Sequence, residues 1–320
     1  MRTIFDLDIF KYLLCCIAFV STNIAAEECK PSRWGAGDQI GSANHVNPAR
    51  VLMASTLVKK GESHPLGIVV DPAMPAFPPR SMSLQIVQPG QHNGRDTEQD
   101  FGWPVVYNDD MAQLWFGIGS QLDGLGHMGE AGMYYNCNKA VDFIDISGLK
   151  KLGTHQVPPL IGRGVLINMA KHFGVETMTA GQAISSKDIK AAAKAQGVKF
   201  REGDVILFHT GWTDGKLESE PKVWGAGQPG LTNEAFAYIG SLDPMAVGAD
   251  TWGIDAVPAA PGDKLFYGHV EMLLKRGIYL LETMNTGRLA SEEVREFMFV
   301  LGQARIKGTV QMIINPVAMW

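Results

Sequence analysis

Residues 117–127 read Gly117-Ile118-Gly119-Ser120-Gln121-Leu122-Asp123-Gly124-Leu125-Gly126-His127. They follow an apolar run at 114–116 that is typical of a strand. If the chain stays extended, the side chains of Gln121 and Asp123 leave from one face, because strand side chains alternate. The glycines allow the backbone to approach a ligand or a metal ion closely. Taken alone, the pattern fits equally well with an Asp-Gly turn beside a structural histidine.

A second candidate for chemistry is His269, which precedes a helical pattern at 270–275 and an apolar strand-like run at 278–281. Glu282 ends that apolar run and is expected to be buried. A buried carboxylate needs a cation or hydrogen-bond donors to stabilise it. A metal ion would serve, and so would Arg276, and the spacing alone does not choose between them.

The composition describes a globular chain. Its 320 residues are 46% hydrophobic and 19% charged, which provides enough apolar material for a sizeable core. The formal net charge is -5 and no long basic run is present, so a nucleic-acid-binding function is excluded. The 36 glycines and 17 prolines indicate many turns between short elements rather than a helix bundle.

The first 26 residues have the layout of a secretory signal peptide. Basic residues precede an apolar run at 12–20, and a short stretch of small and polar residues follows at 21–26. No other run approaches the ~20 apolar residues of a membrane span. We therefore expect a signal peptide at 1–26 and an exported, soluble mature domain at 27–320, either secreted or periplasmic. A tethered or simply frayed N-terminus is the alternative.

The cysteines leave one question open. Cys15 and Cys16 fall inside the expected signal peptide, so the mature chain retains Cys29 and Cys137. Two cysteines are too few for a cysteine metal cluster. In an exported protein they can form a disulfide or remain two free thiols, and the sequence does not decide which.

Short strands outnumber helices in the pattern of the chain. Strand-like runs flanked by turn residues lie at 66–70, 83–87, 112–118, 141–146, 164–169, 204–209, 245–249, 278–283 and 310–314. Helical patterns lie at 185–195, 233–239, 270–275 and 291–297. In the first of these, Ser185 and Asp188 form a capping box and Gly197 marks the end. Because strands and helices do not strictly alternate, we predict an α+β fold rather than a doubly wound sheet.

At its two candidate segments the sequence resembles the cyclase family of metal-dependent hydrolases, which includes bacterial kynurenine formamidase and isatin hydrolase. Further matches follow in the same order along the chain, at 34–44, 163–166, 203–212, 248–253, 308–309 and 315–316. The family signature H-x-G-T-H-x-D-x-P-x-H corresponds to residues 117–127. Asp123 and His127 are kept, whereas Gly117 and Gln121 replace the first two histidines. The chain resembles a variant branch with Gln in the second position, and a single swivelling β/β/α domain is implied.

The resemblance also implies a ligand set. In two-metal members the missing histidines help to hold one ion, while Asp123, His269 and Glu282 match ligands of the other. Gln121 offers only a neutral amide oxygen, a weaker donor than imidazole. We therefore expect one divalent ion per chain, Zn or Mn, held by Asp123, His269 and Glu282 with Gln121 as a weak fourth ligand.

The implied reaction is hydrolysis of an amide or lactam carbon–nitrogen bond in a small, aromatic or cyclic substrate. His127 would act as general acid and base, because an imidazole with an ordinary pKa of ~6.5 suits both roles near neutrality. The side chains that could form the substrate pocket, if they are not ordinary core, are Trp115, Phe116, His209, Trp212 and Trp252.

Two rival functions remain open at this stage. A secreted protein on the same scaffold could bind a small molecule without turnover, because a fold does not fix a function. A metal-dependent lyase or dehydratase could use the same ion while His127 removes a proton. The resemblance further implies a homo-oligomer.

Overall fold

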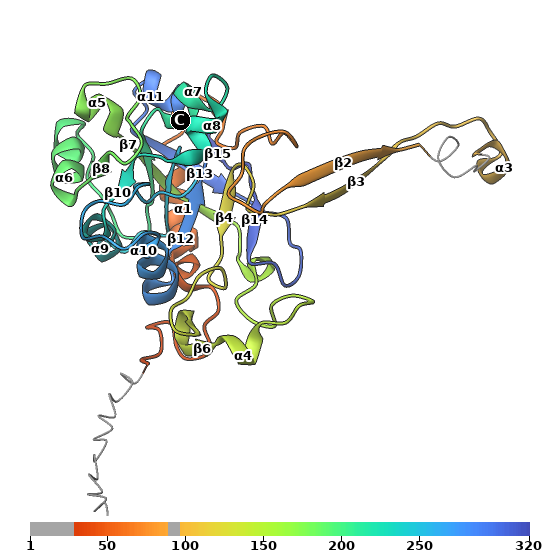
Figure 1. Cartoon of the computed structure of the whole chain (residues 1–320), viewed down its shortest axis with the longest axis horizontal. Helices are drawn as coiled ribbons and strands as arrows, with labels where there is room; N and C mark the ends of the chain where they lie inside the picture. The colour runs from red at the N-terminus through yellow and green to blue at the C-terminus, as the bar shows by residue number, and fades with distance from the viewer. Residues whose placement is uncertain (1–28, 89–96) are drawn as a thin grey trace, which may run out of the picture.

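A mixed β-sheet forms the centre of the computed structural model, which describes residues 29–88 and 97–320 (Figure 1). Within these residues the sheet has nine strands. In order across the sheet they are β1 (Ser63–Pro65), β15 (Val317–Met319), β13 (Glu296–Leu301), β7 (Leu160–Asn168), β9 (Val205–His209), β11 (Ala246–Ala249), β12 (Tyr279–Glu282), β4 (Gln121–Asp123) and β14 (Gln311–Ile313). Three two-stranded pairs lie outside it: β2 (Met82–Val87) with β3 (Asp109–Leu114), β5 (Met133–Tyr134) with β6 (Asn138–Lys139), and β8 (Ala183–Ile184) with β10 (Gly230–Leu231).

The helices are short. The α-helices are α1 (Pro48–Ser55), α3 (Thr97–Phe101), α4 (Ala140–Phe143), α5 (Met169–Phe173), α6 (Ser186–Ala195), α7 (Trp212–Lys216), α8 (Pro221–Ala226), α9 (Asn233–Ser241), α10 (Tyr267–His269) and α11 (Gly287–Ser291). Single 3₁₀ turns form η1 (Gly41–His45), η2 (Tyr135–Cys137) and η3 (Thr154–Gln156), and the π-helical η4 (Val270–Arg276) continues directly from α10. Helix α9 packs against both α6 and η4, and α1 packs on β7 and β13.

The middle of the sheet is parallel and fully buried. Strands β7, β9, β11 and β12 run in the same direction. Every residue of β9, β11 and β12 is buried, as expected for parallel strands covered on both faces. The edges of the sheet are antiparallel. The mixed α/β single domain agrees with the predicted fold class, and most of the predicted strands lie within two residues of an observed one.

The antiparallel strand β4 positions the candidate chemistry. Its register with β12 places Gln121 opposite Glu282 and Asp123 opposite Leu280. On its other side, β14 places Gln311 opposite Asp123. The strand that was predicted to present Gln121 and Asp123 on one face is therefore an inner strand of the sheet.

The predicted helix at 185–195 is confirmed, including its capping box. The Ser185 side chain accepts a hydrogen bond from the Asp188 backbone, and the Asp188 carboxylate accepts one from the Ser185 backbone. Gly197, just beyond the helix, has a φ of +71°, a conformation that glycine adopts readily. The predicted helices at 233–239 and 270–275 are also observed, the second as π-helix.

Three predicted elements are wrong. Residues 66–70 form only an isolated bridge beyond the short strand β1. Residues 291–297 do not form a helix: Ser291 ends α11, the chain turns at Glu293, which has a φ of +55°, and β13 begins at Glu296. Residues 141–146 are not a strand: they overlap α4 and continue with Ile144 and Ile146 exposed to solvent, so their apolar side chains find no sheet to join.

Strands β2 and β3 form a ribbon that projects away from the body (Figure 1). We call residues 82–88 and 97–114 the arm. Helix α3 lies toward its far end, whereas Phe77 and Arg80 lie in the segment that leads into it.

The predicted signal peptide at 1–26 lies outside the described residues. None of the helices within the described ranges has the length and hydropathy needed to cross a membrane. Cys29 and Cys137 form a disulfide, with their Cα atoms 5.7 Å apart, which settles the alternative that the sequence left open. The bond joins the N-terminal segment to η2 across 108 positions of sequence.

Removing this disulfide should destabilise the domain, because a cross-link over such a long loop lowers the entropy of the unfolded chain. We expect the double variant Cys29→Ser/Cys137→Ser to lose about 2–5 kcal/mol of unfolding free energy, measured by chemical denaturation. Reductant should produce a similar loss in the wild type and no further loss in the double variant. A wild type that is indifferent to reductant would contradict the cross-link.

Candidate metal centre

Four of the residues predicted to surround a metal ion lie together. Strand β4 presents Gln121 and Asp123, strand β12 ends at Glu282, and α10 ends at His269, all of them buried. Donor atoms of Asp123, His269 and Glu282 lie within 4.8 Å of one another. These segments are far apart in sequence, so the β4–β12 pairing and the end of α10 are what bring the group together.

His269 is held from both sides of its ring. Its Nε2 lies 3.0 Å from Glu282 Oε1 and its Nδ1 lies 3.1 Å from Asp255 Oδ2. Asp255 also accepts a hydrogen bond from the backbone of Gly268 at 3.0 Å, which fixes the carboxylate. A carboxylate behind a ligating histidine orients the ring and raises its basicity. Sequence reasoning missed Asp255, although it stands two residues beyond the matched run at 248–253.

Two glutamines donate hydrogen bonds to the carboxylates. Gln121 Nε2 lies 2.6 Å from Glu282 Oε2 and 3.2 Å from Asp123 Oδ1, and Gln311 Nε2 lies 2.7 Å from the same Asp123 oxygen. Gln121 was predicted as a weak fourth ligand through its amide oxygen. In the structure its amide nitrogen faces the carboxylates instead, so Gln121 supports the ligand groups by donating hydrogen bonds. Gln311 was not predicted, and its register opposite Asp123 depends on the sheet order.

The hydrogen bonds from the two glutamines do not satisfy every buried carboxylate oxygen, and this favours binding of a cation. Asp123 Oδ2 is buried and has no hydrogen-bond partner among the described residues. It lies 3.6 Å from His269 Nε2. Burial, together with the negative charge of Asp123, raises the pKa of Glu282 to about 7. A divalent ion would pair the orphaned oxygen and relieve the repulsion between the two carboxylates, and the carboxylate and imidazole donors suit Zn or Mn.

Arg276, the other cation considered for Glu282, pairs with Glu271 instead, at 2.8 Å. A second cluster of possible donors, His45, Glu202 and Asp243, already has cationic partners. Arg50 Nη2 lies 3.1 Å from Glu202, and Arg33 contacts both His45 and Asp243. That cluster is a surface ion-pair network rather than a competing metal site.

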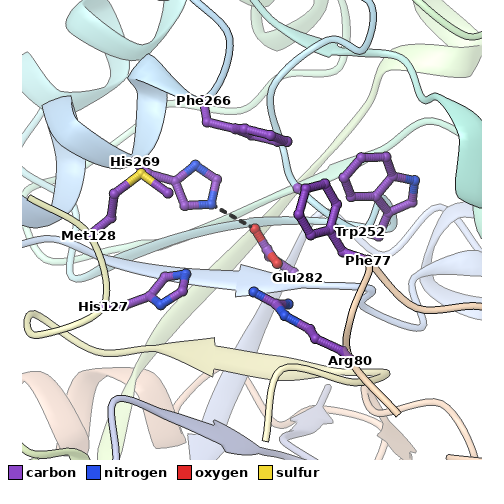
Figure 2. A pocket seen from close by; sticks show the side chains of 9 residues that line it. Phe77, Arg80, His127, Met128, Trp252, Phe266, His269 and Glu282 are labelled. Carbon is purple, nitrogen blue, oxygen red and sulfur yellow. Dashed lines mark hydrogen bonds and ion pairs between the residues drawn. The ribbon is translucent and has the colours of Figure 1, made fainter. Parts of the chain in front are cut away.

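A cavity of about 140 Å³ opens directly over the candidate centre (Figure 2). Its lining residues are Phe77, Arg80, His127, Met128, Trp252, Gly253, Phe266, His269 and Glu282. The rings of Phe77, Trp252 and Phe266 form an aromatic wall, with centroids 5.8 to 6.2 Å apart. Figure 2 shows His127 and His269 on one side of Glu282 and Phe77 and Trp252 on the other, while Phe266 packs edge-on against His269 with ring centroids 5.7 Å apart.

The sequence profile of a family described as putative cyclase matches residues 63–256, more than half of the chain. The chain belongs to this cyclase family. A crystal structure of a novel cyclase is 25% identical and aligns over 90% of this chain and 98% of its own, with a TM-score of 0.78. The family predicted from the sequence is thereby confirmed.

More distant structures share the cyclase fold. Isatin hydrolase A from Labrenzia aggregata, bound to benzyl benzoate, is 17% identical over 83% of this chain and 95% of its own, with a TM-score of 0.57. A predicted metal-dependent hydrolase from Bacillus stearothermophilus is 15% identical over 80% of this chain and 97% of its own, with a TM-score of 0.51. A search of curated proteins found no significant match.

In this cyclase-family chain, Arg80 occupies the space beside Gly117. Its Nη1 donates a hydrogen bond to the Gly117 carbonyl at 2.7 Å. A Cβ atom at position 117 would lie 2.5 Å from the same nitrogen, so only glycine leaves the guanidinium where it is. The place where the family signature has its first histidine therefore holds the positive charge of a guanidinium instead.

His127 lines the cavity beside the carboxylates. Its Nε2 lies 3.7 Å from Asp123 Oδ2, and its ring centroid lies 6.3 Å from that of His269. Burial lowers the pKa of His127, so the imidazole is neutral at neutral pH. The pKa of His269 moves the other way: burial alone would lower it, but the contacts with Asp255 and Glu282 raise it well above its usual value.

Of the predicted pocket residues, only Trp252 lines the cavity. Trp115 is half exposed at the root of the arm, and Phe116 packs against the core. Trp212 is buried, with its indole NH 3.4 Å from the carbonyl of Trp224. His209 is a buried strand histidine whose Nδ1 lies 2.8 Å from Thr286 Oγ1. The other two aromatic wall residues come from loops that carry no periodic signal.

Metal binding should compete with protons at this centre. At pH values below about 7, Glu282 carries a proton in the metal-free protein, and His269 carries one as well, so an ion must displace both. We expect about one tightly held Zn or Mn per chain, with an apparent affinity that weakens as the pH falls through 7. Calorimetry in buffers of different ionisation enthalpy would measure the released protons.

Glu282→Gln removes the carboxylate at constant size and should abolish tight binding, whereas Glu202→Gln alters only the surface network and should leave it unchanged. Two firmly held ions, or an affinity independent of pH between 5 and 8, would contradict the assignment.

Proposed function

We propose that this chain is a metal-dependent hydrolase that cleaves an amide or lactam carbon–nitrogen bond in a small aromatic or cyclic substrate. The observation that carries the proposal is the juxtaposition of an unpaired buried carboxylate oxygen, on Asp123, with a cavity walled by aromatic rings. Asp123, His269 and Glu282 would hold one Zn or Mn ion. When bound, the ion would polarise a carbonyl and lower the pKa of a coordinated water.

The cavity sets the size and character of the substrate. A cavity of about 150 Å³ lined by apolar side chains accommodates benzene, and this one measures about 140 Å³. A single ring, or a compact fused pair that extends toward the mouth, would pack against Phe77, Trp252 and Phe266. The ring would then hold its carbonyl group close to His269 and Glu282.

His127 is placed to move protons. In its neutral form it can accept a proton from the attacking water and then return it to the leaving nitrogen. The lowered pKa supports the first of these steps, because the imidazole begins unprotonated. Asp123, 3.7 Å away, would stabilise the imidazolium that forms between the two steps.

Arg80 supplies a fixed positive charge to the same cavity. Figure 2 shows its guanidinium pointing toward Glu282, and its Nη1 is anchored on the Gly117 carbonyl. A preorganised cation beside the reacting carbonyl stabilises the negative charge that develops on its oxygen. We assign Arg80 this role together with that of orienting the substrate.

We further propose that the mature chain works outside the cytoplasm. The disulfide between Cys29 and Cys137 supports this, because such bonds persist in oxidising compartments and are rare in the reducing cytosol. The apolar run at 12–20 is the corresponding targeting signal. N-terminal sequencing of exported material should begin near Glu27, and soluble protein that retains Met1 would contradict it.

A substrate screen in ¹⁸O-labelled water tests the reaction class. Purified metal-loaded chain is offered aromatic amides, lactams and esters, and product masses are measured. Incorporation of one labelled oxygen into a carboxylic acid product supports hydrolysis. Turnover without label would favour a lyase or dehydratase, and tight binding without turnover would favour a binding protein.

Substitutions of the two cavity histidines, His127 and His269, should have different effects on metal binding and turnover. His127→Ala should keep the metal and lose roughly 100- to 10,000-fold in turnover, the usual share of acid–base catalysis. His269→Ala should lose the metal and, with it, part of the stability that the metal confers. Metal content, thermal midpoint and turnover are measured for each variant. His172→Ala, a partly exposed histidine on α5, serves as the control. Full activity in a metal-loaded His127→Ala variant would contradict the proposed role of His127 in proton transfer.

A further inference from the structure

A second, smaller hollow lies beside the cavity over the candidate centre. This second hollow measures about 20 Å³, and its lining includes Ile118, Gln121, Trp224 and Thr283. A water molecule needs ~10–15 Å³ by this measure, whereas a cavity that accommodates benzene has about 150 Å³. The second hollow is therefore large enough for a water-sized group and too small for an aromatic ring. A ring can use this space only if the second hollow is joined to the main cavity.

Three side chains separate the two spaces. Phe77, Arg80 and Trp252 line both the main cavity and the second hollow, and we call these three residues the partition. The ring centroids of Phe77 and Trp252 lie 5.8 Å apart with their planes inclined by 36°, and the guanidinium carbon of Arg80 lies 5.9 Å from the centroid of Phe77. In the view of Figure 2 the ring of Phe77 stands between Trp252 and Glu282. The aromatic wall of the main cavity is thus also the wall of the second hollow.

Two members of the partition are anchored by hydrogen bonds. The indole NH of Trp252 donates to the carbonyl of Trp224 at 2.8 Å. Arg80 Nη1 donates to the carbonyl of Gly117 at 2.7 Å. Phe77 has no hydrogen-bonding group on its side chain, and its ring is held by contacts with neighbouring rings. Its backbone carbonyl accepts a hydrogen bond from the Arg80 amide at 3.0 Å, so a turn closed on the anchored arginine positions the ring.

We propose that Phe77 is a specificity-determining residue, whose ring closes off the second hollow and so favours substrates built on one aromatic ring over those built on two. Removing the ring would join the two spaces, because Trp252 and Arg80 keep their anchors and do not collapse into the gap. The inference rests on the proposed function in one respect, namely that the aromatic cavity receives the ring of the substrate.

The exposure of Phe77 makes the inference accessible to mutation. Its side chain is 47% exposed, so Phe77→Ala removes little packing from the core and should leave the domain folded. A pocket discriminates by about 10- to 200-fold for each methylene that it has or lacks room for. The space for a whole second ring should therefore change the choice between ligands measurably.

The test is the affinity of the Zn-loaded protein for two amides, benzamide and 2-naphthamide, measured by calorimetry. The wild type should bind benzamide more tightly than 2-naphthamide. Phe77→Ala should shift the ratio of the two affinities toward 2-naphthamide by about 10- to 100-fold. Phe77→Tyr keeps the ring and should keep the wild-type ratio, which a general disturbance of the loop would not do. Phe101→Ala removes an equally exposed ring, 51% exposed on α3, and serves as the matched control.

Circular dichroism and zinc content establish that each variant is folded and loaded. An affinity ratio that is unchanged in Phe77→Ala overturns the inference. So does a wild type that prefers 2-naphthamide or binds neither amide, a Phe77→Tyr variant that behaves like Phe77→Ala, or an equal shift in Phe101→Ala. Turnover is scored separately from affinity. A shifted ratio in a protein that hydrolyses no amide contradicts the proposed function and supports the partition, whereas turnover with an unshifted ratio contradicts the partition alone.

Discussion

The antiparallel pairing of β4 with β12 is the constraint on which the candidate centre depends. It places two carboxylates, Asp123 and Glu282, on neighbouring buried strands in a region where a bare negative charge is costly. Hydrogen bonds from the amides of Gln121 and Gln311, and the contact with the ring of His269, offset part of the free-energy cost of burying these charges. Asp123 Oδ2 has no hydrogen-bond partner among the described residues, so it is the atom that a bound cation would stabilise most directly.

The cavity combines these polar groups with an aromatic wall. The candidate metal ligands come from β4, β12 and α10 and are buried, whereas the aromatic wall residues Phe77, Trp252 and Phe266 come from loops. Arg80 belongs to the loop group too, yet it is anchored on the Gly117 carbonyl just before β4. The candidate metal ligands on the sheet and on α10 are thus separate from the aromatic wall on loops, so the wall can vary in sequence without disturbing the ligands.

The sequence predicted those site residues that stand in a motif or at the end of an apolar run. Asp123, His127, His269 and Glu282 could be predicted because they stand in a recognisable motif or end an apolar run, and the buried parallel strands could be predicted from their composition. Asp255, Gln311 and Arg80 could not, because each reaches the centre through strand order or a loop path that no local pattern encodes. Trp212 was predicted in the pocket from its residue type and His209 from the resemblance to relatives, but the direction of each side chain depends on tertiary packing. The predicted helix at 291–297 is wrong because the chain turns at Glu293, where φ is +55°, and enters β13 at Glu296.

The close contact between Gly117 and Arg80 also limits the order in which this sequence can change. A side chain gained at position 117 would push the guanidinium out of the cavity, while loss of Arg80 would leave room there that glycine does not fill. A histidine at 117 therefore requires the Arg80 guanidinium and the Gln311 amide, both at the ends of flexible side chains, to move aside. Two positions 37 residues apart are thus tied as an epistatic pair, and their residues should be inherited together among chains that share this centre.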